Sequence, residues 1–292
     1  MKFRCLVLAV AIIAGCSSGD DKKIEPVVVG GKSTTEQRVL VELVAQKIEG
    51  AGMPVDRRFD MGTTSDLDSA IRAGKIDVYV EYGGTALINI ARSAAAASVL
   101  AQGRDAIMAR LRAEYGSTGL TWTEPLGLDA PYTLVVRGGS GAFNISEAAR
   151  ASHGWRAAFS WEFQQSSGGY PAARRAYAFD FPETKTLEAS KLYPALADHS
   201  VDIVEGHATD PELQKLHFLA LEDDKHAFGT NPAVPVVRIA ALQKFPNLKG
   251  ALDGMVDWLD AQKMREMNEK VANNGTPVGD VVRQFISDQS LF

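Results

Sequence analysis

The chain has 292 residues and a formal net charge of −5, and its 31 Lys and Arg residues form no cluster suited to a nucleic-acid partner. Beyond the N-terminus, no apolar run approaches the roughly 18 residues that a membrane-spanning helix needs. The remaining part, about 265 residues, is long enough for one large domain or two lobes.

The N-terminus has the pattern of a secretory signal. Two basic residues precede an apolar run at 5–13 that is too short to span a bilayer, and Ala-Gly-Cys follows. The cysteine narrows this to a bacterial lipoprotein signal over residues 1–15, with Cys16 as the lipid-modified mature N-terminus. An ordinary signal peptide with a chance cysteine is the alternative. Residues 16–26 are polar and aperiodic, which predicts a flexible tether.

Strand and helix patterns then alternate. Strands are predicted at 27–29, 55–59 and 76–80, with helices between them and Ala-rich helices up to Tyr115. The first of these helices has one apolar face, made by Val39, Leu40, Leu43, Val44 and Ile48. This β-α-β-α-β order favours a largely parallel α/β sheet that binds ligands at the carboxyl ends of its strands.

The same alternation recurs in the second half. The expected elements are a strand at 132–137, helices around 146–150, 170–178 and 187–197, a strand at 201–204, and helical structure from Leu248 to Ile286. Two strands resemble each other, YTLVVR at 132–137 and VPVVR at 234–238. They are either unrelated buried strands or the paired connections through which the chain enters and leaves a second lobe.

The start of the first helix is a candidate anion site. PVVVGGKS at 26–33 lacks the first glycine of a phosphate-binding loop, so a nucleotide site is not expected. Ser33 and Glu36 instead have the spacing of a capping box, which predicts a helix that starts directly after a strand. The free amides of such a start attract a carboxylate, or the box is a purely structural cap.

Enzyme signatures are scarce in the sequence, and EDDKH at 222–226 is interpreted as a solvated turn rather than a metal site. The five histidines show no metal-binding spacing, and GGSGA at 138–142 lacks the last glycine of a nucleophile elbow. Removal of Cys5 with the signal and lipidation of Cys16 leave no thiol for a disulfide or a metal. We therefore expect no catalytic residue, metal or cofactor.

Five segments carry a resemblance to a known family: VGGKSTTEQRVLVELVAQKIEGAG, IDVYVEYGGTAL, APYTLVVR, VDIVEGHATD and LEDDKHAFGTNPAVPVVR. They occur in the order seen in the substrate-binding proteins of glycine betaine, choline and osmoprotectant importers. The resemblance implies a two-lobed α/β fold of the periplasmic-binding-protein type, with two hinge strands and the ligand in the cleft. It implies a first lobe of residues 27–133 plus 236–292 and a second lobe of residues 134–235.

The same resemblance implies the site. The family holds a trimethylammonium head in a cage of aromatic rings, because ring faces attract a cation that cannot donate hydrogen bonds. Tyr82 and Thr85 in EYGGT, Tyr132 in PYTLVVR and Gln37 in TTEQ match its pattern. Gly83 and Gly84 would let the backbone approach the ligand. The further expected contacts are Ser33 and Thr34 at the helix start, His207 and Thr209 in GHATD, Tyr170 and Asn231.

Three positions depart from the family. His207 stands where many relatives have tyrosine, Asn231 replaces a cage tyrosine, and the segment containing Ser166 lacks the usual arginine. A cage with two aromatic walls replaced should favour cations less and hydrogen-bonding groups more.

The implied function is that of the extracytoplasmic solute-binding component of an ATP-binding-cassette importer, in the periplasm or at the cell surface. Its expected partners are a permease, an ATPase, and the membrane through the lipid anchor only. The expected ligand is a small quaternary amine such as glycine betaine or choline. The alternatives are another small zwitterion bound mainly by hydrogen bonds, an enzyme using the same cleft, and an adhesin without a small-molecule site.

Overall fold

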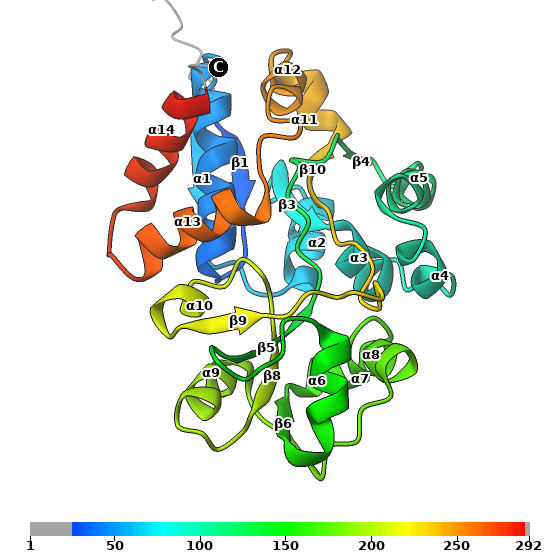
Figure 1. Ribbon diagram of the computed structural model, residues 1–292. Helices are drawn as coiled ribbons and strands as arrows, with labels where there is room; N and C mark the ends of the chain where they lie inside the picture. The colour runs from blue at the N-terminus through cyan, green and yellow to red at the C-terminus, as the bar shows by residue number, and fades with distance from the viewer. Residues whose placement is uncertain (1–24, 290–292) are drawn as a thin grey trace, which may run out of the picture.

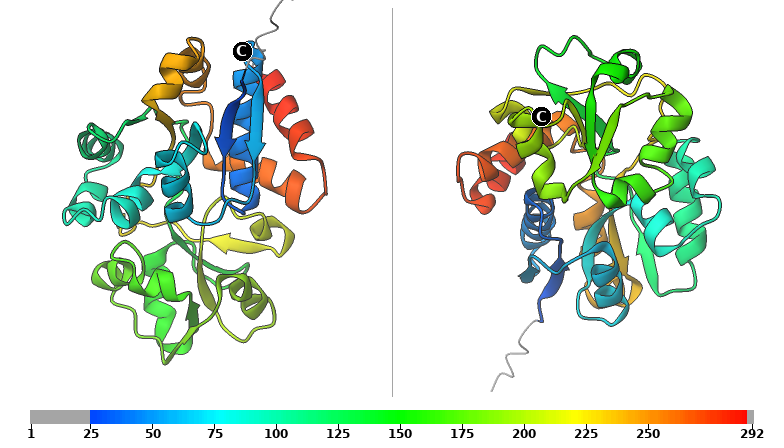
Figure 2. Two further views of the ribbon diagram at one scale, coloured as in Figure 1. Left: turned by 180° about the vertical axis from the view of Figure 1, so that it is seen from behind. Right: turned by 90° about the horizontal axis from the view of Figure 1, so that it is seen from below.

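Two separate five-stranded sheets organise the computed structural model, which describes residues 25–289 (Figure 1). The predicted signal and Cys16 lie outside the described residues. The first sheet, with the helices packed on it, forms the first lobe, which holds both ends of the described chain. The second sheet and its helices form the second lobe, built from the green to yellow segments in Figure 1. The views from behind and below in Figure 2 show the same division.

The first sheet has the strand order β2-β1-β3-β10-β4. β1 is parallel to β2 and β3, whereas β10 is antiparallel to β3 and β4. The bounds are β1 Val27–Gly30, β2 Val55–Arg58, β3 Val78–Tyr82, β4 Leu120–Trp122 and β10 Ala233–Arg238. The three parallel strands come from the predicted β-α-β-α-β run, and β10 arrives from the second lobe.

The second sheet repeats this plan with the order β7-β6-β8-β5-β9. β6 is parallel to β7 and β8, and β5 is antiparallel to β8 and β9. The bounds are β5 Thr133–Arg137, β6 Arg156–Phe159, β7 Glu183–Thr186, β8 Ile203–Gly206 and β9 Phe218–Ala220. In both sheets, the fourth strand is the one that has just crossed from the other lobe.

Helices cover both faces of the first sheet. Alternation along β3 sends Val78 and Val80 towards α1 and the C-terminal helices, and Tyr79 towards α2 and α5. The helices of this lobe are α1 Thr35–Gly50, α2 Thr64–Arg72, α3 Gly83–Thr85 with the π-helical η1 Ala86–Ile90, α4 Ala96–Leu100, α5 Arg104–Tyr115, α11 Ile239–Lys244, α12 Leu248–Asp253, α13 Ala261–Ala272 and α14 Val278–Gln289. The predicted apolar face of α1 is confirmed, because all five of its residues are fully buried.

The longest helix of the second lobe has 9 residues, whereas α1 has 16. The helices of this lobe are α6 Ile145–Ala151, the 3₁₀ helix η2 Ser152–Gly154, α7 Trp161–Gln165, α8 Tyr170–Tyr177, α9 Ala189–Ala197 and α10 Glu212–Lys215. One side of its sheet packs a cluster of aromatic rings, in which Phe159 lies 5.3 Å from Phe163 and 4.7 Å from Tyr170 between ring centroids. No helix of the described residues 25–289 is both long and apolar enough to cross a membrane.

The resemblance between the two arginine-ending strands has a structural explanation. Arg238 at the end of β10 bonds to Asp77 at 3.0 Å, and Arg137 at the end of β5 bonds to Asp202 at 2.6 Å. Each aspartate precedes the neighbouring strand and also accepts a backbone N–H from a parallel strand, from Val28 at 3.0 Å and from Arg156 at 2.9 Å. The same ion pair therefore ties the incoming strand to the parallel strands in each lobe.

The chain crosses between the lobes immediately before β5 and β10. The two crossing segments touch at an isolated antiparallel bridge between Asp129 and Pro232. Nearby, the N–H of Asn231 donates to Asp129 Oδ1 at 2.5 Å and that of Ala130 to the Asn231 carbonyl at 3.2 Å. The lobe boundaries expected at 133/134 and 235/236 fall inside β5 and β10, and each of these strands lies wholly in one sheet.

Most predicted elements are confirmed to within a few residues, including β1, β2, β3, β5 and β8. Four strands of three or four residues each, β4, β6, β7 and β9, were not predicted from the sequence. The predicted capping box was wrong, because α1 begins one residue later than expected. Thr34 is its N-cap and accepts the N–H of Gln37 at 3.2 Å.

Candidate functional site

A cavity of about 900 Å³ lies between the two lobes. The first lobe contributes the starts of α1 and α2, the end of β3 and Asn268 of α13, and the second lobe contributes the start of α7 and the loop after β8. Its lining includes eight of the ten expected contacts: Thr34, Gln37, Tyr82, Thr85, Tyr132, His207, Thr209 and Asn231. The carboxyl ends of β3 and β8 both lie at this cavity, as the parallel-sheet rule predicts.

Ser33 and Tyr170 lie elsewhere. Ser33 is exposed in the bend before α1 and is outside the cavity lining. Tyr170 packs against Phe159 in the second lobe and lines a different surface pocket with Arg174 and Arg175. Their roles as ligand contacts stay predictions.

The shifted start of α1 changes the role of two side chains. In the expected capping box, Glu36 would bond back to the Ser33 backbone, but with Thr34 as the cap the third helical position belongs to Gln37. Gln37 is 2% exposed, and its Nε2 donates to the Val80 carbonyl at 3.3 Å. Glu36 is thereby free to turn its carboxylate into the cavity.

Tyr82 lies at the end of β3 and donates its hydroxyl to Glu36 Oε1. Burial, together with the charge of the Glu36 carboxylate, holds the pKa of Tyr82 well above its usual value, so the phenol keeps the proton that it donates. The ammonium of Lys32 lies 5.4 Å from the Tyr82 ring centroid and 2.6 Å from Oε1 of the fully buried Glu81. Part of the Tyr82 ring therefore already attracts a cation of the protein itself.

The two glycines after Tyr82 serve packing. A Cβ on Gly83 would lie 2.7 Å from Ile107 Cγ2, and one on Gly84 would lie 2.8 Å from Leu100 Cδ2 and 2.9 Å from Asn231 Oδ1. These separations are too short for a side chain. The structure thus corrects our expectation for this pair, because the close approach that requires glycine is to protein atoms.

Asn231 has a role within the protein. Its Oδ1 accepts the N–H groups of Gly84 at 2.9 Å and Thr85 at 3.2 Å, which caps the start of α3. Its Nδ2 donates to Thr85 Oγ1 and to the Ala130 carbonyl, both at 3.3 Å. This side chain therefore connects the crossing segments to α3, which begins directly after Tyr82.

Tyr132 and His207 form the wall from the second lobe. Their ring centroids are 5.1 Å apart at an interplanar angle of 33°, and Tyr132 meets Phe163 edge-on at 4.9 Å. Burial raises the pKa of Tyr132 well above its usual value, so its hydroxyl is neutral. The backbone N–H of His207 donates to Asp210 Oδ2 at 2.8 Å, and the same oxygen accepts the Tyr193 hydroxyl at 2.5 Å.

Sequence reasoning missed several lining residues. Trp161 at the start of α7 is 70% exposed and lines the cavity beside Glu162. Asn268 on α13 is 1% exposed and donates from Nδ2 to the Thr209 carbonyl at 2.9 Å. Trp161, flanked by polar residues, offered a weak signal as a surface aromatic, whereas Asn268 lies in an amphipathic helix with no local sign of a site.

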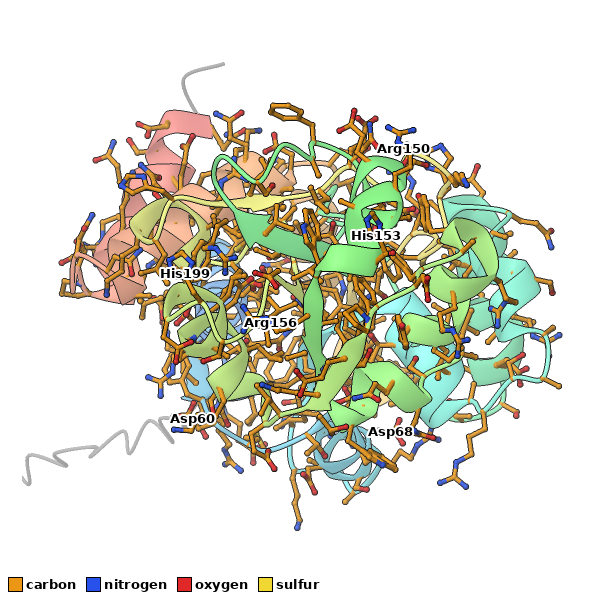
Figure 3. The ribbon with its side chains drawn as sticks, turned by 60° about the horizontal axis from the view of Figure 1, so that its bottom comes forward. Asp60, Asp68, Arg150, His153, Arg156 and His199 are labelled. Atoms are coloured by element: carbon orange, nitrogen blue, oxygen red, sulfur yellow. The ribbon has the colours of Figure 1, made fainter. Side chains whose placement is uncertain are left out.

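The site offers no metal centre. Within residues 25–289, no group of three or more His, Cys, Asp or Glu side chains is placed to hold an ion. His153 and His199 lie on the second lobe, which comes forward in Figure 3, and neither lines the cavity. The carbonyl of His199 accepts Arg156 Nη2 at 2.6 Å, which places this residue at the far end of the second sheet.

The fold and the interlobe cavity define a two-lobed solute-binding protein. Residues 25–288 match the family described as the substrate-binding domain of ABC-type glycine betaine transport systems. The chain belongs to this family, whose members are transport binding proteins rather than enzymes. The resemblance found in the sequence is therefore confirmed.

The similar proteins have low sequence identity to this chain, but the similarity covers most of its length. The ergothioneine transport permease/ergothioneine binding protein EgtU of Helicobacter pylori (strain G27) is 25% identical over 252 residues, which cover 85% of this chain but only 44% of that protein. The glycine betaine-binding protein YehZ of Escherichia coli (strain K12) is 25% identical over 278 residues, or 90% of each chain. A solved structure described as a glycine betaine/carnitine/choline ABC transporter shares the fold, with a TM-score of 0.79, 20% identity, and coverage of 90% of this chain and 98% of that one.

Proposed function

We propose that this protein is the extracytoplasmic solute-binding component of an ATP-binding-cassette importer and that it captures a small quaternary amine, such as glycine betaine or choline. The observation that carries the proposal is the cavity of about 900 Å³ whose walls come from both lobes. A small amine in such a cavity contacts both walls only when the lobes approach each other, so binding and closure are coupled.

Aromatic rings on both walls support the ligand class. Tyr82 lines the cavity from the first lobe, and Tyr132 and Trp161 line it from the second. Ring faces attract a quaternary ammonium by about 0.5–2 kcal/mol each, and this attraction needs no hydrogen bond from the cation. The exposed ring of Trp161 gains most from closure, because 70% of its surface is open before a ligand covers it.

The hinge lies in the two crossing segments at 129–132 and 229–232. They meet at the Asp129–Pro232 bridge, and the strands that follow are fixed in their sheets by the duplicated Arg–Asp ion pairs. Rotation about these segments would move each lobe as a rigid body. We place the lobe boundaries there, a few residues before those expected from the sequence.

The proposal includes an anchor and partners. Cys16 would carry the lipid that holds the protein at the membrane, in the periplasm or at the cell surface, where a permease and an ATPase receive the ligand. Replacement of Cys16 by serine should move the protein from the membrane fraction to the soluble one or leave its signal uncleaved. Unchanged fractionation would remove the anchor from the proposal.

A different small zwitterion, bound mainly by hydrogen bonds, is the second candidate. The observation that favours it is the number of hydroxyl and amide side chains in the lining, among them Thr34, Thr63 and Asn89. Such a ligand would depend on the polar groups more than on the ring faces.

Isothermal titration calorimetry with a panel of quaternary amines and zwitterions tests the function. We expect saturable one-to-one binding of at least one quaternary amine, with the ligand recovered unchanged by mass spectrometry. Binding of a non-quaternary zwitterion alone would select the second candidate, and chemical conversion of the ligand would indicate an enzyme. Absence of binding across the panel would contradict the proposal.

A further inference from the structure

The cavity has an excess of negative charge. Four carboxylates line it, those of Glu36, Glu162, Asp210 and Glu212, against one ammonium group and one imidazole. No arginine is among its lining residues in the described part of the chain. A ligand that carries its own carboxylate would therefore find few cationic partners here.

Two of the other charged groups in the lining, Lys32 and Asp210, already have partners within the protein. Lys32 Nζ lies 2.6 Å from Glu81, which is fully buried and cannot be left without its partner at low cost. Asp210 accepts the Tyr193 hydroxyl and a backbone N–H, so its charge holds the loop after β8 in place. Lys32 is consequently a poor partner for a ligand carboxylate.

Glu36 differs from these groups. It is half-buried in the cavity wall at the first turn of α1, and the Tyr82 hydroxyl and Asn268 Nδ2 are its hydrogen-bond donors among the described residues. Both donors are neutral, and none of the ion pairs found among residues 25–289 involves this carboxylate. It also occupies the helix start where a ligand carboxylate would otherwise benefit from the free amides.

A second acceptor beside Glu36 lacks a donor. Asn268 Nδ2 lies 3.4 Å from Glu36 Oε2 and 2.9 Å from the Thr209 carbonyl, which fixes the orientation of the amide. Its Oδ1 is buried and has no hydrogen-bond partner in the described structure. A buried acceptor without a donor is costly, which points to a ligand that supplies one.

We propose that Glu36 is the counter-ion of the ligand and that this cavity selects a small organic cation without a carboxylate, whose hydroxyl or N–H group donates to Glu36 and Asn268. The inference rests on the proposed function and narrows its ligand class. Choline has these properties, whereas glycine betaine carries the same trimethylammonium head but places a carboxylate where choline has a hydroxyl. The two compounds therefore differ mainly in the group that Glu36 would distinguish.

The test is calorimetric titration of choline and glycine betaine into the wild-type protein and into Glu36→Gln. The substitution keeps the size of the side chain and an oxygen that accepts the Tyr82 hydroxyl, but it removes the charge. The wild type should bind choline at least about tenfold more tightly than glycine betaine, since opposite charges attract strongly in a partly buried site. Glu36→Gln should lower the affinity for choline by about tenfold, so that the affinities for choline and glycine betaine become similar or reverse their order.

Glu266→Gln is the matched control. Glu266 is exposed on α13 outside the cavity lining, and its replacement changes the net charge of the protein by the same amount. It should leave both affinities within about twofold of the wild type, because an exposed charge is screened by solvent and salt.

The outcomes separate the two proposals. Two results would overturn the role of Glu36 but leave the solute-binding function intact. The first is that the wild type binds glycine betaine at least as tightly as choline, and the second is that Glu36→Gln loses equal affinity for both compounds. Failure of the wild type to bind any quaternary amine would contradict the proposed ligand class, and failure to bind any compound of the panel would contradict the function itself. Should Glu36→Gln be unfolded by circular dichroism, the wild-type preference and its weakening with added salt decide the matter.

Discussion

Tyr82 contributes a ring to the cavity wall and a hydroxyl to Glu36, and two substitutions separate these contributions. Tyr82→Phe keeps the ring but releases Glu36, which should weaken binding of the preferred amine by about 0.5–1.5 kcal/mol. Tyr82→Ala removes the ring as well and should cost about 0.5–2 kcal/mol more. Calorimetric titration measures both, and wild-type affinity in a folded Tyr82→Ala protein would exclude Tyr82 from the site.

Asn231 should matter more for stability than for ligand selectivity. Asn231→Tyr would restore the aromatic residue expected from the family, but it also leaves the Gly84 and Thr85 amides without their acceptor. We expect Asn231→Ala and Asn231→Tyr each to lower the free energy of unfolding by about 1–3 kcal/mol, as measured by urea denaturation.

The exposed Asn274→Ala serves as the control for Asn231 and should change the free energy of unfolding by less than about 0.5 kcal/mol. An Asn231→Tyr protein as stable as the wild type, with increased affinity for trimethylammonium compounds, would instead support the aromatic cage and contradict the capping role.

At the residue scale, most of the contacts predicted from the sequence line the cavity, but the excess of negative charge among its lining residues was not predicted. Tyr82 and His207 lie at the carboxyl ends of the parallel strands β3 and β8, where parallel sheets bind ligands. Tyr132 precedes the antiparallel β5, whose first residue pairs with Gly206 at the same end of β8. Glu36 escaped prediction because Ser33 and Thr34 are both suitable caps, and the sequence pattern does not decide between them. One residue of difference turns Glu36 from a capping partner into a cavity side chain.

At the scale of elements, α13 joins the lobes. It packs on α1 and α14 of the first lobe and lies beside α10 of the second (Figure 1). Two of its side chains and that of its C-cap residue donate to carbonyls of the second lobe. Arg265 bonds to Ala208, Asn268 to Thr209 and Asn273 to Pro211, each at 2.9 Å. These bonds hold the loop that carries His207 and Thr209 against the cavity.

Removal of the outer two bonds should loosen this contact. In the double variant Arg265→Ala/Asn273→Ala, we expect weaker ligand binding by about 1–3 kcal/mol, because each lost hydrogen bond contributes about 0.5–1.5 kcal/mol. The radius of gyration of the ligand-free protein in small-angle X-ray scattering should rise. Glu266→Ala, exposed on the same helix, is the control. Unchanged affinity and scattering in the double variant would show that α13 does not restrain the lobes.

Elements with strong periodicity were predictable, and short ones were not. The buried face of α1 and the apolar run of β3 have clear patterns, because each packs against a core. β7 reads ETKT and is largely exposed at the edge of its sheet, so no apolar alternation marks it. The hydrogen bonds of α13 join residues more than 50 positions apart, which no local pattern records.

At the scale of the whole molecule, the two lobes are versions of one plan. Each has three parallel strands, an antiparallel fourth strand that has just crossed over, and an Arg–Asp pair that fixes it. Because the fixed strands begin directly after the crossings, we expect flexibility to be concentrated in the short segments around the Asp129–Pro232 bridge. This arrangement favours hinge motion over distortion of either sheet.

Closure is the property of the whole molecule that is open to direct measurement. A ligand that contacts Tyr82 on one lobe and Tyr132 or Trp161 on the other gains its second set of contacts only when the lobes approach, so it favours the closed form. Saturation with the amine that binds most tightly should therefore lower the radius of gyration. The same ligand at about 100 times its dissociation constant should raise the free energy of unfolding by about 2.7 kcal/mol. A panel compound that shows no heat of binding provides the control for both measurements. If calorimetry shows binding while the scattering curve stays unchanged, the ligand is held without movement of the lobes, and hinge closure is refuted although solute binding stands.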